Sequence, residues 1–286
     1  MQTVTTLTDL RNAVDSLRRK GEIALVPTMG ALHNGHLTLV REAAKRAPNV
    51  AVSIFVNPTQ FGPNEDLDAY PRQLAQDSAL LEAEGAALLW APPVEEVYPP
   101  GYATNISVSG VSEGLCGAKR PGHFNGVATI VCKLFNQVRP DIALFGEKDW
   151  QQLAVIRRMA RDLDLTRPHA DAIIGIPTVR EDDGLAMSSR NANLSPQDRT
   201  SAAILPRAMR EAIAAIESGG NVPAILDQLR AQLTKNGFAS VDYATLADAD
   251  SLEPLATTPA SPARLLVAAR IGQTRLIDNM HVAPGA

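Results

Sequence analysis

Apolar runs alternate with amphipathic segments along the first 177 residues of the chain. Runs rich in Ile, Val, Leu and Ala predict strands at residues 23–26, 50–56, 86–89, 142–145 and 172–176. The run at 50–56 is almost continuously apolar, which is typical of a parallel strand covered on both faces. The alternation predicts an α/β fold built on a Rossmann-like, doubly wound parallel sheet.

Helical periodicity predicts the connections between these strands. Helices are expected at residues 8–20, from 37 onward, at about 70–84, at 127–138, and after 152 to about 163. Pro27 is expected to end the first strand, and Gly21 to cap the first helix.

The pattern changes after Pro177. Residues 179–190 are polar, and Ser195-Pro196 then starts a long Ala-rich helical region that Pro206 is expected to bend. A helix at 222–235 is followed by strand-like runs, of which the last two resemble an antiparallel pair; the three runs are at 241–246, 264–269 and 275–277. We therefore predict a Rossmann-like domain at 1–178 and a smaller α+β domain at 179–286.

Composition narrows the class of protein. The 286 residues are 45% hydrophobic and 20% charged, which suits a globular protein with a real core. The net charge is −4, and the 27 Lys and Arg are scattered, so we expect no nucleic-acid partner. The start of the chain lacks the pattern of a secretion signal, and no run is long enough to span a bilayer. Cys116 and Cys132 lack metal-site spacing, so reduced thiols and a cytoplasmic location are expected.

A turn at residues 26–37 carries the most specific chemistry. It joins the end of a strand to the start of a helix, at the edge of the sheet where α/β proteins bind ligands. His33 and His36 are three residues apart, and Gly35 leaves no Cβ between them and a ligand. A lone histidine at a helix start is usually a cap, but an H-x-G-H pair beside free helix N–H groups predicts a phosphate-binding site.

Three more polar segments follow predicted strands or the domain boundary, at residues 57–62, 146–152 and 187–190. They supply phosphate-binding groups (Lys148, Ser188, Ser189, Arg190), an acceptor for ribose hydroxyls (Asp149) and amides for a polar substrate (Gln60, Gln152). A glycine-rich segment at 114–126 carries Lys119, Arg120 and His123, and it is either a flexible linker or a lid that closes over phosphates.

The ordered motifs resemble those of the pantoate–β-alanine ligases (pantothenate synthetases), within the H-x-G-H nucleotidyltransferase superfamily. The matching segments are 27–36, 55–62, 122–129, 146–152 and 187–191. The resemblance implies ATP-dependent condensation of (R)-pantoate with β-alanine through a pantoyl adenylate, which gives pantothenate, AMP and pyrophosphate. It also implies Mg2+, a homodimer, and a second domain that acts as a lid and keeps water from the adenylate.

The resemblance implies roles for individual residues. The catalytic set is His36, His33, Lys148 and Arg190, with His36 as the acid of the first half-reaction. The ATP-binding set is Met29, Gly30, Ala31, Leu32, His33, Asn34, Gly35, His36, Gly146, Glu147, Lys148, Asp149, Val179, Met187, Ser188, Ser189 and Arg190. Substrate binding is assigned to Gln60, Gln152 and Asn57, and Met29 is also expected to pack on the methyl groups of pantoate. The metal ligands are unknown, with Asp77 one candidate through water.

Two alternatives stay open at this point. One is an adenylyltransferase of the same superfamily that leaves the nucleotide on its product; Gln60, Asn57 and residues 147–149 favour the ligase. The other is a catalytically silent nucleotide-binding regulator, which both histidines, Lys148 and Arg190 disfavour.

Overall fold

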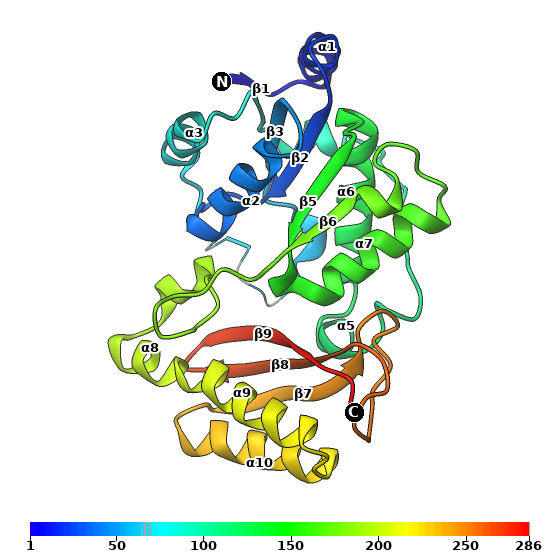
Figure 1. Cartoon of the computed structure of the whole chain (residues 1–286). Coiled ribbons are helices and arrows are strands. Elements are labelled where there is room, and N and C mark those ends of the chain that lie inside the picture. Colours follow the sequence, from blue (N-terminus) through cyan, green and yellow to red (C-terminus); the bar gives the residue numbers. More distant parts are fainter. Residues whose placement is uncertain (64, 66, 69, 286) are drawn as a thin grey trace. The chain divides into compact units, whose positions relative to one another are not determined.

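The computed structural model describes residues 1–63, 65, 67–68 and 70–285. The chain divides into two compact units (Figure 1). Unit 1 contains residues 1–112, 120–147 and 152–177, and unit 2 contains residues 113–119, 148–151 and 178–286. None of the described helices combines the length and apolarity that a membrane span needs.

Unit 1 is built on a six-stranded sheet in which every pair is parallel. The strands are β1 (Gln2–Val4), β2 (Ile23–Thr28), β3 (Asn49–Ile54), β4 (Leu88–Trp90), β5 (Ile142–Gly146) and β6 (Ile173–Ile176). Their order, β1-β4-β3-β2-β5-β6, reverses direction between β2 and β5. The predicted doubly wound α/β fold is confirmed, and its switch point lies at the carboxyl ends of β2 and β5.

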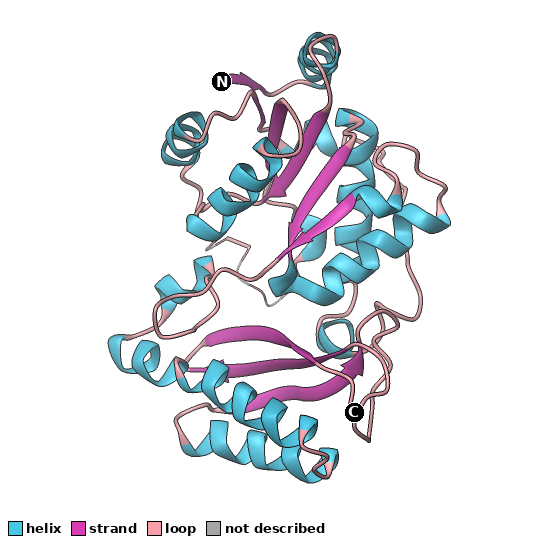
Figure 2. Ribbon diagram, viewed as in Figure 1, coloured by secondary structure: helices cyan, strands magenta, loops and turns pink. Residues whose placement is uncertain are grey.

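Helices cover both faces of this sheet (Figure 2). They are α1 (Leu7–Arg18), α2 (Asn34–Ala44), α3 (Leu74–Ala83), α4 (Val94–Val97), α6 (His123–Val138) and α7 (Trp150–Asp162), with 3-10 turns η1 (Pro58–Gln60), η2 (Glu147–Asp149) and η3 (Ala170–Ala172). A buried cluster that includes Val26, Val40, Val52, Leu81 and Leu89 fills the space between the strands and the helices α2 and α3.

Several predicted bounds in unit 1 were wrong. Strand β2 continues through Pro27 to Thr28, because Pro27 still fits the parallel register opposite Ser53. Strand β1 escaped prediction because it has only three residues, two of them exposed. Helix α1 ends with Arg19 as its cap rather than Gly21.

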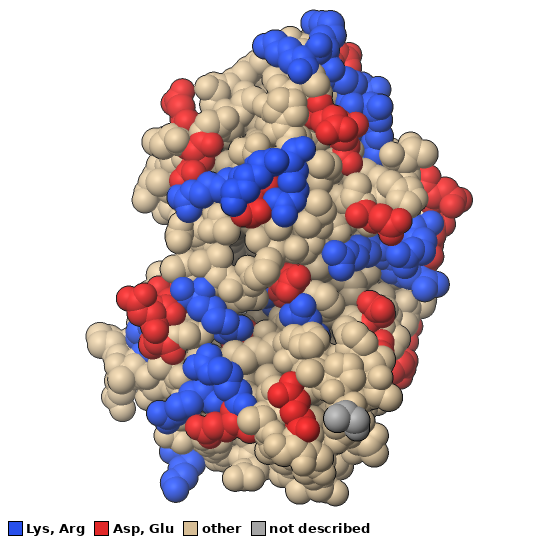
Figure 3. Space-filling view, in the orientation of Figure 1, with Lys and Arg blue, Asp and Glu red and all other residues tan. Residues whose placement is uncertain are grey.

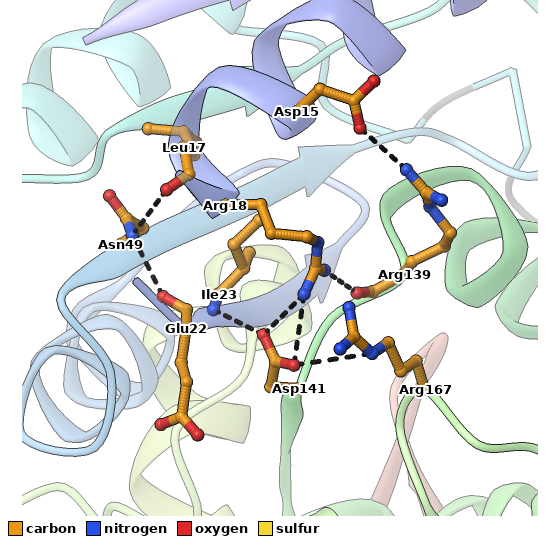
Figure 4. Close-up of polar contacts among 9 residues, drawn as sticks. All are labelled: Asp15, Leu17, Arg18, Glu22, Ile23, Asn49, Arg139, Asp141 and Arg167. Atoms are coloured by element: carbon orange, nitrogen blue, oxygen red, sulfur yellow. Dashed lines mark hydrogen bonds and ion pairs between the residues drawn. The ribbon is translucent and has the colours of Figure 1, made fainter. Parts of the chain in front are cut away.

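The amino ends of the strands are held by a separate polar network (Figure 4). Asp141, just before β5, accepts the N–H of Ile23 at 2.9 Å and pairs with Arg18 at 3.2 Å. Asn49, at the start of β3, donates to the carbonyls of Leu17 and Glu22. These polar groups fix the edge of the sheet opposite the switch point.

Unit 2 has a three-stranded antiparallel sheet with the order β7-β8-β9. Its strands are β7 (Ser240–Asp248), β8 (Ala263–Ile271) and β9 (Thr274–Val282), and its helices are α5 (Leu115–Lys119), α8 (Pro196–Ala202), α9 (Ile204–Glu217) and α10 (Val222–Lys235), with the 3-10 turn η4 (Ser189–Asn193). Helices α9 and α10 contact the sheet through a core that includes Leu205, Met209, Leu229, Leu233 and Leu265. The predicted smaller α+β domain is confirmed as a fold.

Two predictions in unit 2 need correction. The expected bend at Pro206 is a break at Ala203 between α8 and α9, and Pro206 lies in the first turn of α9, where a missing N–H costs nothing. Strand β9 runs well past the predicted residues 275–277, because the polar side chains of Asp278 and Asn279 interrupt its apolar pattern while being buried.

A single boundary at residue 178 does not describe the division of the chain. Residues 113–119 and 148–151 belong to unit 2, although they precede that boundary. Gln151 joins the two segments, since its side chain accepts the N–H of Cys116 at 2.9 Å and donates to the carbonyl of Gly114 at 2.8 Å. Trp150 donates to the carbonyl of Ala249 at 2.8 Å and anchors its segment to unit 2. These contacts are invisible to sequence periodicity.

On the face shown in Figure 3, Lys and Arg side chains are interspersed with Asp and Glu. That distribution agrees with the scattered charges of the sequence, and the absence of a nucleic-acid partner stays a prediction.

Candidate functional site

The histidine turn, residues 29–36, leaves the carboxyl end of β2 at the switch point (Figure 1). Asp77 of α3 holds the turn through two hydrogen bonds. This residue is 1% exposed, and its carboxylate accepts the N–H groups of Ala31 and Leu32, each at 2.9 Å. Gly30 has φ +84°, and a Cβ there would lie 3.0 Å from the carboxylate of Asp77. The turn therefore depends on a glycine and on a buried acid 46 residues away in the chain.

Both oxygens of Asp77 are used by this backbone. Asp77 therefore has a structural role in the turn, and its contribution to Mg2+ binding through water stays a prediction. Among the residues that the structure describes, no group of three or more His, Cys, Asp or Glu is arranged to hold a metal ion.

Asp77→Ala should destabilise the turn, because two buried N–H groups would lose their acceptor at about 1–3 kcal/mol each. Thermal unfolding and adenylate formation should both show the loss. Asp77→Asn keeps one acceptor oxygen, so its stability should lie between that of the wild type and that of Asp77→Ala. An Asp77→Ala variant with wild-type stability would contradict this role.

The two imidazoles cap the helix that follows. His33 is the N-cap of α2 and its Nδ1 accepts the N–H of Gly35 at 3.1 Å, while Nδ1 of His36 accepts the N–H of His33 at 3.3 Å. The ring centroids are 4.1 Å apart. Because each Nδ1 accepts a hydrogen bond, the ring proton of each histidine is placed on Nε2.

This geometry corrects the expected source of the anion-binding groups. The helix begins at Asn34 rather than after His36, and the N–H groups of Ala31, Leu32, His33 and Gly35 all have partners within the protein. The turn therefore places two imidazole rings at the positive end of the α2 dipole.

The amide of Asn57 is used entirely by the fold. It donates to Oε1 of Gln60 and to the carbonyl of Gly126, each at 3.1 Å, and it accepts from the hydroxyls of Tyr98 at 2.8 Å and Thr59 at 2.9 Å. Burial raises the pKa of Tyr98, which keeps this phenol a donor. Asn57 therefore holds Gln60 through its amide, and its role in substrate binding stays a prediction.

Gln60 lies beside the histidine turn. Its side chain is 9% exposed, and its Nε2 is 3.0 Å from Sδ of Met29. The structure thus brings together two segments that the sequence separates by about 30 residues. Gly146 is the last residue of β5, the strand beside β2, Glu147 follows it, and Gln152 lies in the first turn of α7.

In unit 2, Val179 and Met187 belong to a short hairpin, and residues 188–190 follow it. Met187 donates its N–H to the carbonyl of Val179 at 3.0 Å, and Ser188 caps η4 by accepting the N–H of Arg190 at 3.3 Å. Lys148 approaches Asp149 at 3.9 Å, and its carbonyl accepts from Asn279 at 3.0 Å.

Arg180 anchors this hairpin and was not singled out from the sequence. It makes two hydrogen bonds of 2.7 and 2.9 Å to Asp278, whose side chain is fully buried. An arginine in a polar loop carries no sequence signal for a partner 98 residues away.

The glycine-rich segment is neither simply a linker nor a free lid. Lys119 belongs to unit 2, whereas Arg120 and His123 belong to unit 1. Arg120 pairs with Glu65 through contacts of 2.6 and 2.5 Å, so its charge is already engaged within the fold.

A doubly wound sheet with an H-x-G-H turn at its switch point defines a nucleotidyltransferase-type enzyme. The family model for pantoate-beta-alanine ligase matches residues 2–281. The chain therefore belongs to the pantoate–β-alanine ligase family, which lies within that superfamily.

Relatives with curated names match nearly the whole chain and support this family assignment. The chain is 70% identical to a pantothenate synthetase of Novosphingobium aromaticivorans, covering 99% of this chain and 100% of the relative, and 60% identical to that of Rhizorhabdus wittichii, covering 99% of each. The activity of the family, and of this enzyme, is the ATP-dependent condensation of pantoate with β-alanine.

Solved structures are similar over nearly the whole chain. The pantothenate synthetase of Thermus thermophilus is 47% identical, with a TM-score of 0.92 and coverage of 99% of this chain and 100% of its own. The ligase of Francisella tularensis, described as complexed with beta-gamma ATP and beta-alanine, is 34% identical, with a TM-score of 0.82 and coverage of 98% and 97%.

Proposed function

We propose that the histidine turn carries the first half-reaction, in which pantoate becomes an acyl adenylate. A carboxylate does not condense with an amine unaided, because oxide is a very poor leaving group. Attack of the pantoate carboxylate on the α-phosphorus of ATP forms the acyl–phosphate bond and releases pyrophosphate. The β-alanine amine then attacks the acyl carbon, loses a proton, and AMP leaves.

The observation that carries this proposal is the reciprocal capping of His33 and His36. It fixes both rings side by side, with Nδ1 of each ring accepting a backbone N–H and the ring proton on Nε2. A fixed donor that faces the charge developing on the phosphates lowers the barrier without reorganisation. The geometry supports His36 as an Nε2–H donor to that charge, which refines its assignment as the acid.

Other residues are assigned by family resemblance. We propose that the phosphates are bound by Lys148, Ser188, Ser189 and Arg190, the ribose by Asp149 with Gly146 and Glu147, and the adenine beside Val179 and Met187. Residues 29–36 of the histidine turn complete the ATP-binding set. The Francisella ligase, which carries an ATP compound and β-alanine according to its description, supports this proposal.

The acyl substrate is assigned to unit 1. We propose that Gln60 binds pantoate and then β-alanine, that Gln152 binds pantoate, and that Met29 packs on its methyl groups. The contact between Met29 and Gln60 supports the shared location. ATP chemistry implies Mg2+, and we propose that the phosphates supply most of its ligands. A homodimer and a cytoplasmic location stay predictions, and sedimentation of the purified protein tests the first.

The reaction class is tested by product analysis with purified enzyme, ATP, pantoate and Mg2+. Sustained turnover should require β-alanine and should yield AMP and pantothenate in equal amounts. A product that retains the nucleotide would contradict the ligase reaction and support the adenylyltransferase alternative. Pyrophosphate exchange into ATP that depends on pantoate would exclude a silent regulator.

A further inference from the structure

Gln60 is held by a chain of three side chains that the reaction itself does not explain. We call Glu65, Arg120 and His123 the Gln60 tether. The main-chain carbonyl oxygen of Gln60 lies 2.8 Å from Nδ1 of His123 and 3.4 Å from a guanidinium nitrogen of Arg120. A second guanidinium nitrogen of Arg120 lies 2.9 Å from Nε2 of His123.

The donors and acceptors of this chain allow one arrangement. A carbonyl only accepts, so Nδ1 of His123 donates to Gln60. Arg120 only donates, so Nε2 of His123 accepts from it. Glu65 fixes the guanidinium in turn by accepting two hydrogen bonds, from Nε and a terminal nitrogen of Arg120.

The ion pair that ends the chain is partly buried. The side chains of Arg120 and Glu65 are 18% and 25% exposed. Burial alone would raise the pKa of the Glu65 carboxyl, but hydrogen bonding and charge attraction from Arg120 outweigh it and lower that pKa. A partly buried ion pair adds little net stability to the fold. Its main effect here is to fix the position of the Arg120 guanidinium.

The other end of Gln60 is fixed independently. Asn57 donates to its side-chain oxygen at 3.1 Å, so the main chain and the amide of Gln60 are both held. Helix α6 supplies His123 to the tether, and its Gly126 packs against Thr59 and Gln60. The tether therefore holds the main chain of Gln60, while Asn57 holds its side-chain amide.

We propose that Glu65, Arg120 and His123 are positioning residues for the pantoate-binding step and that they act through Gln60. This inference rests on the assignment of Gln60 to pantoate made above. It differs from the lid hypothesis, in which the charge of Arg120 binds the phosphates of ATP and its loss raises the KM for ATP.

The test is a double-mutant cycle on the full enzyme, with Arg120→Met, Gln60→Ala and their combination. Arg120→Met should raise the KM for pantoate about tenfold, since a small displacement of a positioning group costs one to two orders of magnitude. The KM for ATP should change by less than about twofold. In the Gln60→Ala background, Arg120→Met should add no further effect. Glu65→Gln should reproduce the Arg120→Met pattern more weakly, and Arg120→Lys, which cannot make the two-pronged contact, should not restore wild-type KM.

The matched control is Arg18→Met, which breaks an ion pair of similar exposure in the same unit (Figure 4). It should lower the melting temperature without changing the KM for pantoate. A rise in KM for ATP alone, or an Arg120→Met effect that persists in the Gln60→Ala background, would overturn the inference. Pantothenate formation by the wild-type enzyme tests the proposed function by itself, so a failure of this inference in the variants can be told apart from a failure of that function.

Discussion

His36→Ala is expected to slow pyrophosphate release in a single turnover by about a hundredfold or more, the scale of losing a donor to transition-state charge. In the structure, Nδ1 of His36 accepts the N–H of His33, so the donor role falls to Nε2. Rapid-quench measurement with ATP and pantoate, without β-alanine, reports this step alone. Unchanged pyrophosphate release would contradict the role.

The alanine variant also removes a helix cap, and a second variant separates the two effects. In His36→Asn, the amide oxygen can take the place of Nδ1 and accept the N–H of His33, while nothing replaces Nε2–H. We expect His36→Asn to keep the melting temperature of the wild type and to lose adenylation as His36→Ala does. Retained adenylation in His36→Asn would assign the defect of the alanine variant to the lost cap.

Gly126→Ala should damage both the stability of the enzyme and its binding of pantoate. A Cβ at this position would lie 2.4 Å from the carbonyl oxygen of Thr59 and 2.7 Å from Cα of Gln60, and both obstacles are backbone atoms. Such overpacking costs about 1–3 kcal/mol and would shift the turn that carries Gln60. Calorimetry and the KM for pantoate should both report the change.

Gly114→Ala is the matched control, because nothing that the structure describes lies within 4 Å of the Cβ that it would add. It should leave stability and the KM for pantoate near wild type. A Gly126→Ala enzyme with wild-type stability and wild-type KM for pantoate would contradict the prediction that a Cβ at this position displaces the turn that carries Gln60.

The sheet and the histidine turn were predictable because their signals are local. Strand β3 is a continuous apolar run, and the H-x-G-H motif occupies four consecutive positions. Strand β1 was missed because three residues bound to β4 at a sheet edge make no apolar run of their own. The end of β2 was misplaced because Pro27 keeps its place in the parallel register.

The support of the site was not predictable, because it consists of polar pairs between distant residues. Asp77 and the turn that it holds are 45 or 46 residues apart, and Glu65 and Arg120 are 55 residues apart. A carboxylate on a helix and an arginine in a loop are usually exposed, so neither signals a buried partner. Asn57 is an example: its position suggested substrate contact, and nothing in the sequence indicated its hydrogen bonds to Gln60 and Gly126.

Formation of the adenylate without the second substrate tests the proposed mechanism most directly. Enzyme in excess over labelled ATP, with pantoate, Mg2+ and no β-alanine, should release pyrophosphate and accumulate pantoyl adenylate. Addition of β-alanine should then convert that intermediate into pantothenate and AMP. Pyrophosphate release that begins only when β-alanine is present would contradict a separate adenylation step at the histidine turn.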